Sequence, residues 1–171
     1  MTDHRIEKLT AAHAVGGFEC GKQPLDRFLT RNALQNQQAS ASTTYVALAN
    51  SEVIGFYTLV VGSVEHDTAQ ATAPRITKGL AKYPVPVIVL ARMAVSTTWH
   101  GKGIGKALLR DAVLRILQAA EIVGVRAMLV HAKDDEARTF YEKFDFASSP
   151  TDPLHMMALI KDLRSLVSPG I

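Results

Sequence analysis

The segment 87–106 constrains the fold more than any other part of the chain. It reads VIVLARMAVSTTWHGKGIGK, an apolar, strand-forming run that passes through a short turn into a glycine-rich loop and then a helical pattern. The first N–H groups of a helix have no intrahelical partner and lie at the positive end of the helix dipole, so they bind anions. Gly101, Gly103 and Gly105 let a ligand approach that backbone closely. The sequence therefore predicts a phosphate-binding cradle.

Two well-known glycine signatures do not fit this loop. A Walker A loop requires a glycine at the position of His100 and a Ser or Thr at the position of Ala107. A dinucleotide-binding G-x-G-x-x-G requires its last glycine where the chain has Lys106. The sequence therefore disfavours both a P-loop enzyme and a Rossmann enzyme.

Strand-forming and helix-forming segments alternate along the chain, which predicts an α/β fold. The length of 171 residues suits a single domain, 1–171, with a sizeable core. Residues 65–86 lack a clean period and are predicted to form a loop with a short helix. Strands are predicted at 5–9, 43–49, 53–61, 87–95, 127–132 and 155–160, and helices from Pro24 onward, at 103–120 and at 135–143.

Composition and charge exclude few classes of function. With 47% hydrophobic and 20% charged residues, the chain is typical of a globular protein, and neither a bilayer-spanning run nor a secretory signal is visible, so we expect a cytoplasmic protein. The net charge of +3 does not separate a nucleic-acid binder from an ordinary enzyme. Cys20 is the only cysteine and is predicted to be a small buried apolar residue, and no spacing indicates a metal site.

Two motifs resemble the GNAT acetyltransferase family. The run from His100 to Gly105 is similar to its Q/R-x-x-G-x-G/A loop, which binds the pyrophosphate of coenzyme A, although His100 stands where Gln or Arg is usual. From Ala132 the chain reads AKDDEARTFYEKFDF, similar to the family's N-x-x-A-x-x-F-Y-E-K-x-G-F segment. In this segment Asp134 and Asp145 stand where Asn and Gly are usual.

The resemblance implies a fold, a cofactor and a catalytic residue. The expected fold is a single GNAT-like α/β domain whose mixed sheet of six to seven strands splays between the fourth and fifth strands, with about four flanking helices. The implied cofactor is acetyl-CoA, and Tyr141 is the implied general acid for the departing thiolate. The cofactor contacts that we expect are Met93, Ala94, Val95, His100, Gly101, Lys102, Gly103, Ile104, Gly105, Lys106, Asp134, Ala137 and Phe140.

The kind of amine that accepts the acetyl group can be inferred from its basicity. An α-amine near pKa 8 is partly neutral at physiological pH, whereas a lysine amine near pKa 10.4 needs a stronger base. Because no carboxylate base is obvious, an α-amine is favoured. Glu65, His66 and His131 are the alternative base candidates, and each is also compatible with a purely structural role.

A longer resemblance points to the GNAT toxins of type II toxin–antitoxin systems. It includes the segments FECG at 18–21, LDRFL at 25–29, LARMAV at 90–95 and SPTDPL at 149–154. It implies acetylation of the α-amine of aminoacyl-tRNA, which blocks translation. It also implies a homodimer and an antitoxin partner, typically a ribbon-helix-helix protein, with DNA contacted only through the antitoxin.

Basic residues are candidate contacts for tRNA phosphates. Two other functions are also compatible with the sequence. Arg92 lies in an apolar run, so its charge must find a cavity or a partner, and the substrate cleft is one place for it. One alternative is a metabolic or protein N-acetyltransferase acting on a small amine or peptide. The other is a GNAT-like binding module without catalysis. The candidate tRNA contacts are Lys22, Arg27, Arg31, Lys78 and Arg92, and a continuous surface formed by them would favour the toxin.

Overall fold

A computed structural model describes residues 4–150 and 152–167 of the chain. The chain divides into two compact units, each with its own hydrophobic core. The first unit comprises Met1–Val60 and Ala91–Ala112, and the second comprises Val61–Leu90 and Val113–Ile171.

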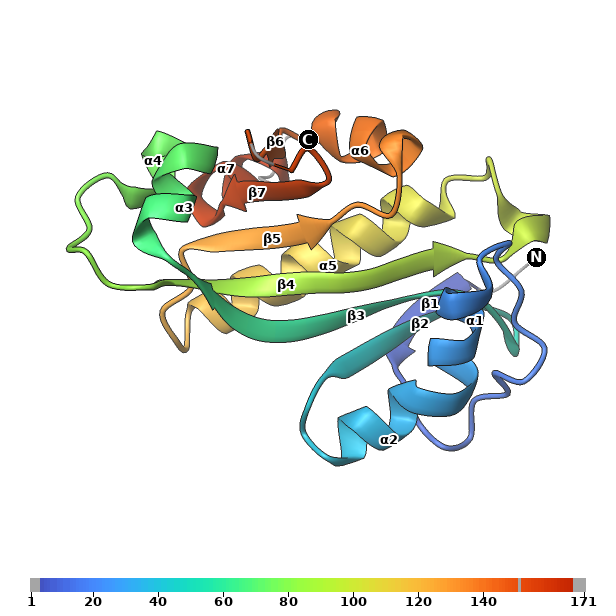
Figure 1. Cartoon of the computed structure of the whole chain (residues 1–171). Coiled ribbons are helices and arrows are strands. Elements are labelled where there is room, and N and C mark those ends of the chain that lie inside the picture. Colours follow the sequence, from blue (N-terminus) through green and yellow to red (C-terminus); the bar gives the residue numbers. More distant parts are fainter. Residues whose placement is uncertain (1–3, 151, 168–171) are drawn as a thin grey trace. The chain divides into compact units, whose positions relative to one another are not determined.

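The strands form one seven-stranded mixed sheet in the order β1-β2-β3-β4-β5-β7-β6 (Figure 1). The β4–β5 pair is parallel, whereas β1–β2, β2–β3, β5–β7 and β6–β7 are antiparallel. The expected mixed sheet of six to seven strands is therefore confirmed. The bounds are β1 His4–Lys8, β2 Thr43–Ala49, β3 Glu52–Val64, β4 Val85–Val95, β5 Ala127–His131, β6 Ala147–Ser148 and β7 His155–Leu159.

Helical segments in the described residues outnumber the four or so that the sequence predicts. The additions are short, because residues 66–77 form two brief helices rather than one, and a further helix directly follows β7. The bounds are α1 Gln23–Arg27, the π-helix η1 Phe28–Asn32, α2 Ala33–Gln38, α3 His66–Thr72, α4 Pro74–Thr77, the 3-10 helix η2 Thr97–Trp99, α5 Ile104–Ala120, α6 Asp135–Glu142 and α7 Ile160–Val167. None of the described helices is long and apolar enough to cross a membrane.

The first unit packs a continuous helical stretch, α1–η1–α2, against its strands. Pro24 lies in the first turn of α1, where its missing N–H costs nothing. Phe28 and Leu29 are buried, and the ring of Phe28 stacks on Phe56 of β3 with centroids 6.2 Å apart. Cys20 is also buried in this core, as predicted.

The second unit is built around β5, whose residues 127–130 are all buried. Helices α3 and α4 cover one face of the strand with Ala69 and Ile76, which share a core cluster with Ala127 and Leu129. The guanidinium of Arg126 donates to the carbonyl of Ile76 at 2.7 Å and so satisfies an end carbonyl of α4.

The parallel ladder between β4 and β5 ends before β4 does. Its register runs from Val87–Ala127 to Leu90–Val130, while β4 continues to Val95. The carboxyl-terminal part of β4 thus extends past the paired section, as expected for a sheet that opens between its fourth and fifth strands.

The turn after α6 generates a stability prediction. Asp145 has a φ of 67°, in the left-handed region that glycine tolerates best, and its N–H donates to the carbonyl of Glu142 at 3.1 Å. We expect Asp145→Ala to lower the free energy of unfolding by about 1 kcal/mol, because alanine lacks the polar group that helps Asp adopt this conformation. Asp145→Gly should be neutral or stabilising. Chemical denaturation measures both variants.

The matched control is Lys143→Ala, because Lys143 is exposed and has an ordinary helical φ of −64°. Its free energy of unfolding should change by less than about 0.5 kcal/mol. Equal stability of the Ala and Gly variants at position 145 would contradict the strain assigned to this turn.

Candidate functional site

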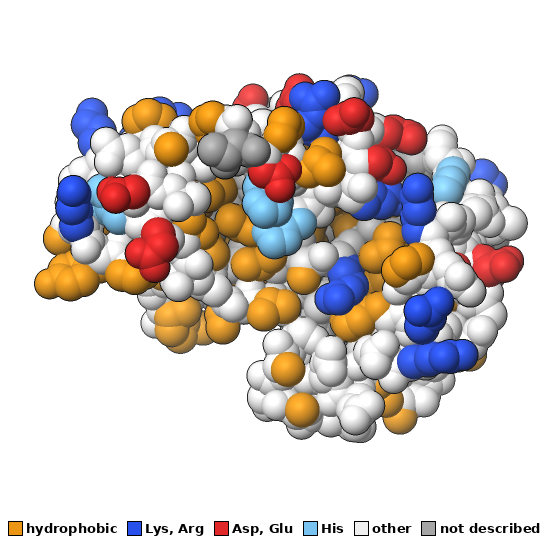
Figure 2. All heavy atoms as spheres, in the orientation of Figure 1, with side chains coloured by type: hydrophobic (Ala, Val, Ile, Leu, Met, Phe, Trp, Pro, Cys, Tyr) orange, Lys and Arg blue, Asp and Glu red, His pale blue; other side chains and the backbone are white. Residues whose placement is uncertain are grey.

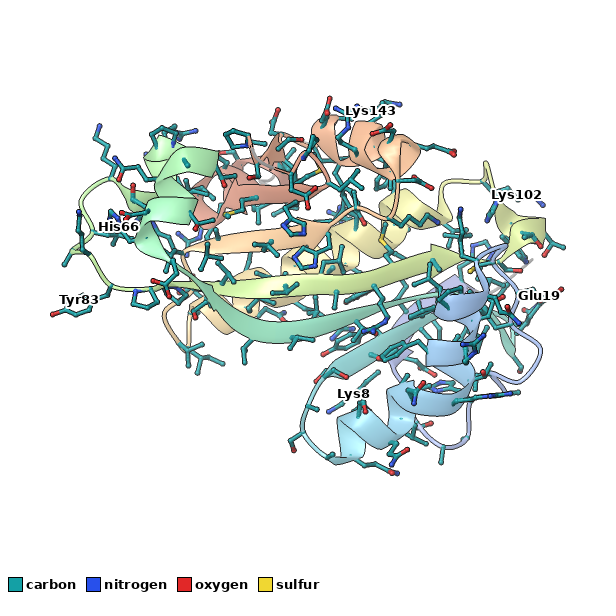
Figure 3. The ribbon with its side chains drawn as sticks, in the orientation of Figure 1. Lys8, Glu19, His66, Tyr83, Lys102 and Lys143 are labelled. Carbon is teal, nitrogen blue, oxygen red and sulfur yellow. The ribbon has the colours of Figure 1, made fainter. Side chains whose placement is uncertain are left out.

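The turn that follows β4 is anchored to the first unit by backbone hydrogen bonds. The N–H of Ser96 donates to the carbonyl of Ile54 at 2.8 Å, and the N–H of Thr97 donates to the carbonyl of Glu19 at 2.9 Å. Figure 3 shows Glu19 and Lys102 at the same end of this unit. The path from strand to helix is therefore fixed before any ligand binds.

His100 has a structural partner in this turn. Its Nε2 lies 2.8 Å from the carbonyl oxygen of Val95, so the protonated nitrogen donates to the end of β4. The sequence places His100 among the cofactor contacts, at a position where the family usually has Gln or Arg. In the structure its ring closes the turn, and the loop backbone remains for the ligand.

Gly101 and Gly103 both adopt left-handed conformations, with φ values of 73° and 81°. A Cβ at either position would meet no atom within 4 Å, so the space beside the loop is open. The N–H of Ala107 donates to the carbonyl of Gly103 at 3.1 Å, which begins the hydrogen-bond ladder of α5. The N–H groups of residues 104–106 precede that bond and have no intrahelical acceptor.

Two lysines add positive charge to this cradle. Lys102 and Lys106 are exposed, and the ammonium of Lys102 lies 5.0 Å from the ring centroid of Trp99. The buried side chain of Ile104 fixes the first turn of α5 to the core. Free amides, open space and two cations together fit a diphosphate.

The end of β4 presents two amides away from β3. The carbonyl of Ala94 lies against Gly55 of β3, and Ser96 donates to the same strand. Because backbone groups of successive residues in a strand point to opposite edges, the N–H groups of Met93 and Val95 point away from β3.

In the second unit, Asp134 begins α6 as its N-cap. Its Oδ1 accepts a hydrogen bond from the N–H of Ala137 at 2.8 Å. Ala137 and Phe140, the other candidate cofactor contacts on this helix, are half-buried. The carboxylate of Asp134 therefore has a capping role, which its sequence motif did not reveal.

Tyr141 lies on α6 among aromatic rings and is 5% exposed. The rings of Phe140 and Phe146 lie at centroid distances of 5.2 and 5.7 Å. Burial raises the pKa of the Tyr141 phenol above its ordinary value, so the hydroxyl keeps its proton at physiological pH. No described residue accepts a hydrogen bond from this hydroxyl, which leaves it available as a donor.

The candidate tRNA contacts divide between the two units. Lys22, Arg27 and Arg31 are exposed on and beside α1 and η1, and the guanidinium of Arg92 lies 3.9 Å from the ring centroid of Phe28 in η1. The sequence predicts that the charge of Arg92 finds a cavity or a partner, and this ring is its partner on the exposed side of β4. Figure 2 shows Lys and Arg side chains gathered over α1 in the first unit.

Lys78 belongs to the second unit and lies in a separate basic groove. The groove has a volume of about 570 Å³. Two of its cations are neutralised, since Arg75 pairs with Asp162 at 3.0 Å and Arg164 with Glu121 at 3.3 Å. Its lining residues are Arg75, Lys78, Ala120, Val125, Arg126, Leu159, Ile160, Lys161 and Arg164.

The three base candidates all lie in the second unit. Glu65 precedes α3 as its N-cap residue, and the Nδ1 of His66 (Figure 3) is buried with no hydrogen-bond partner among the described residues. His131 ends β5, where its ring stacks on His155 of β7. The sequence interpretation missed His155, because the pairing of these strands has no local signal.

Comparison with known proteins agrees with this geometry. The profile of the acetyltransferase (GNAT) domain matches residues 40–148. A tRNA-acetylating toxin of Mycobacterium tuberculosis (strain ATCC 25618 / H37Rv) is 46% identical over 160 residues, which cover 94% of both chains.

Two solved structures share the fold. AtaT complexed with acetyl-methionyl-tRNAfMet has a TM-score of 0.86 at 24% identity and covers 97% of this chain and 100% of its own. A point mutant of the AtaT toxin bound to the C-terminus of the antitoxin AtaR and acetyl-CoA has a TM-score of 0.83 at 24% identity, covering 97% and 99%. The profile match and the 46% identical relative show that this chain belongs to the GNAT acetyltransferase family.

Proposed function

We propose that the chain is a toxin that transfers an acetyl group from acetyl-CoA to the α-amine of aminoacyl-tRNA and so blocks translation. The observation that carries this proposal is the 46% identity to a tRNA-acetylating toxin across 94% of both chains. The cradle at the start of α5 supports the cofactor, because its open backbone and its lysines suit a diphosphate.

Backbone amides and lysine side chains of the cradle each bind the diphosphate of the cofactor. The amides of residues 104–106 hold diphosphate oxygens, while Lys102 and Lys106 add charge. His100 contributes through the turn that it closes on Val95. Acetyl-CoA supplies the thioester that is attacked.

The end of β4 stabilises developing negative charge. In this proposal the N–H groups of Met93 and Val95, which point away from β3, donate to the thioester carbonyl. A donor aimed at the developing oxyanion is worth about 3 to 4 kcal/mol in other enzymes.

Tyr141 donates a hydrogen bond, and then a proton, to the sulfur of the departing thiolate. A phenol is a weaker acid than a thiol, and burial increases the difference in pKa, so Tyr141 acts first as a hydrogen-bond donor to the thiolate. The proton follows as the C–S bond breaks. Loss of the hydroxyl removes this stabilisation without disturbing the cradle.

Basic residues of the first unit suit the phosphates of tRNA. Lys22, Arg27 and Arg31 are exposed on and beside one helical stretch, and Arg92 is tied to that stretch through Phe28. Lys78 remains a candidate through the separate groove that it lines.

The proposal includes partners. By analogy with AtaT, whose structure was solved with the C-terminus of AtaR, an antitoxin neutralises this chain. We propose a ribbon-helix-helix antitoxin through which DNA is contacted, a homodimeric toxin and a cytoplasmic location, where charged tRNA is found.

Substitution of Gly103 tests the cradle. Gly103→Val should weaken acetyl-CoA binding about tenfold or more, because a branched side chain is strained at this φ and fills the space for phosphate. Calorimetric titration measures the affinity. The control is Gly124→Ala, at an exposed glycine with open surroundings, which should bind normally. Unchanged affinity of the Gly103 variant would contradict the cradle.

Substitution of Tyr141 tests the donor. Tyr141→Phe should lower acetyl transfer about tenfold or more while acetyl-CoA affinity stays within about threefold, because only the hydroxyl is lost. Tyr83→Phe is the control, since Tyr83 is 74% exposed on the segment before β4 (Figure 3). Normal turnover of the Tyr141 variant would remove this residue from the mechanism.

A charged-tRNA assay tests the substrate. Incubation with labelled acetyl-CoA and a total charged-tRNA pool should label aminoacyl-tRNA, whereas labelled small amines or peptides alone would support the metabolic or protein acetyltransferase. Binding of charged tRNA should fall steeply with salt, and Arg31→Ala should reduce the salt slope by about 1. Arg110→Ala, on the exposed side of α5, should leave the slope unchanged. A flat salt response would count against tRNA.

A further inference from the structure

Two histidines form a stacked pair at the end of β5. His131 lies opposite His155 in the antiparallel register of β5 and β7. Their ring centroids are 4.3 Å apart with planes inclined by 22°. The strand pairing therefore fixes the position of the His131 ring.

The pair stands where the β4–β5 ladder stops. Val130 is the last β5 residue paired with β4, and His131 follows it directly. Because side chains alternate along a strand, His131 points to the same face as Ala127 and Leu129, the face that α3 and α4 cover further along. Figure 2 shows histidine side chains gathered on an exposed face of the second unit beside acidic groups.

The nitrogens of His131 are open. No described residue forms a hydrogen bond with either ring nitrogen, although the ring is partly covered by His155. His131 is exposed at the end of β5, so a ligand can reach its ring from solvent. An oriented ring with an open nitrogen suits proton transfer to a ligand.

The surroundings keep this ring neutral. Partial burial lowers the pKa of His131 below its ordinary value, and the charge of His155 lowers it further. Asp152 opposes this effect, and its Oδ2 lies 3.4 Å from Nε2 of His155. Within residues 4–150 and 152–167, His155 and Asp152 are the charged groups that act on His131, and the neutral ring can accept a proton at physiological pH.

We propose that His131 is the general base that takes the proton from the acceptor amine, with His155 and Asp152 as positioning residues. The inference rests on the proposed acetyl transfer. The amine nitrogen forms a bond to the thioester carbonyl carbon and loses a proton to His131. The C–S bond then breaks and the sulfur receives a proton from Tyr141. Solvent returns His131 and Tyr141 to their starting states.

The test is the pH profile of kcat with acetyl-CoA and a charged-tRNA pool. His131→Gln should lower kcat about a hundredfold at neutral pH with KM nearly unchanged. It should also abolish the acid limb that lies below the ordinary histidine pKa of about 6.5. His131→Ala should regain activity with added imidazole, which a merely structural residue would not do.

Variants of His155 and Asp152 should shift the pH profile of kcat in opposite directions. Removing a positive neighbour raises the pKa of His131, so His155→Gln should move the acid limb to higher pH. Asp152→Asn should move the limb to lower pH. His13→Gln is the control, because the His13 ring pairs with Glu7 in the first unit, and it should leave the profile unchanged.

The experiment distinguishes failure of the proposed acetyl transfer from failure of the base assignment. If the native chain labels no acceptor, both the proposed function and the base assignment fall. If the native chain is active and His131→Gln keeps its rate and its acid limb, only the base assignment is overturned. Thermal unfolding of each variant checks that the fold is retained.

Discussion

The proposed binding of acetyl-CoA depends on backbone amides at the start of α5 that have no partner within the helix. They are free because a helix cannot satisfy its first N–H groups, and they are held in place because the preceding turn is anchored on β3 and closed by His100 on Val95. Gly101 and Gly103 supply the left-handed conformations that the path requires. The cofactor site is thus a property of chain geometry, to which the side chains of Lys102 and Lys106 add charge.

Much of the fold could be predicted from the sequence because its signals are local. The β-rich runs of β2 and β3, the Asn50 turn between them and the apolar stripe of α5 each lie within one segment. β6 could not be predicted, because it has two residues and exists only through pairing with β7. α7 follows β7 at Ile160 without a breaker, so no Gly or Pro marks where the last strand ends and the helix begins.

The candidate site was predictable where it is made of backbone and less so where it is made of distant side chains. The glycine pattern predicts the open loop before α5, and the aromatic motif predicts Tyr141; the structure gives that loop its left-handed glycines and buries Tyr141. The contact between Arg92 and Phe28 and the stacking of His131 on His155 depend on tertiary packing and strand register. The sequence predicts His100 and Asp134 as cofactor contacts, and only the structure shows that their side chains also hydrogen-bond to the protein's own backbone.

The most direct test of the central claim is a comparison of amide chemical shifts in the 15N-labelled protein with coenzyme A and with pantetheine. Coenzyme A carries the diphosphate and pantetheine does not. The account predicts large shifts at the amides of Ile104, Gly105 and Lys106 with coenzyme A only. Equal shifts with both compounds, or none with coenzyme A, would contradict the role assigned to these amides.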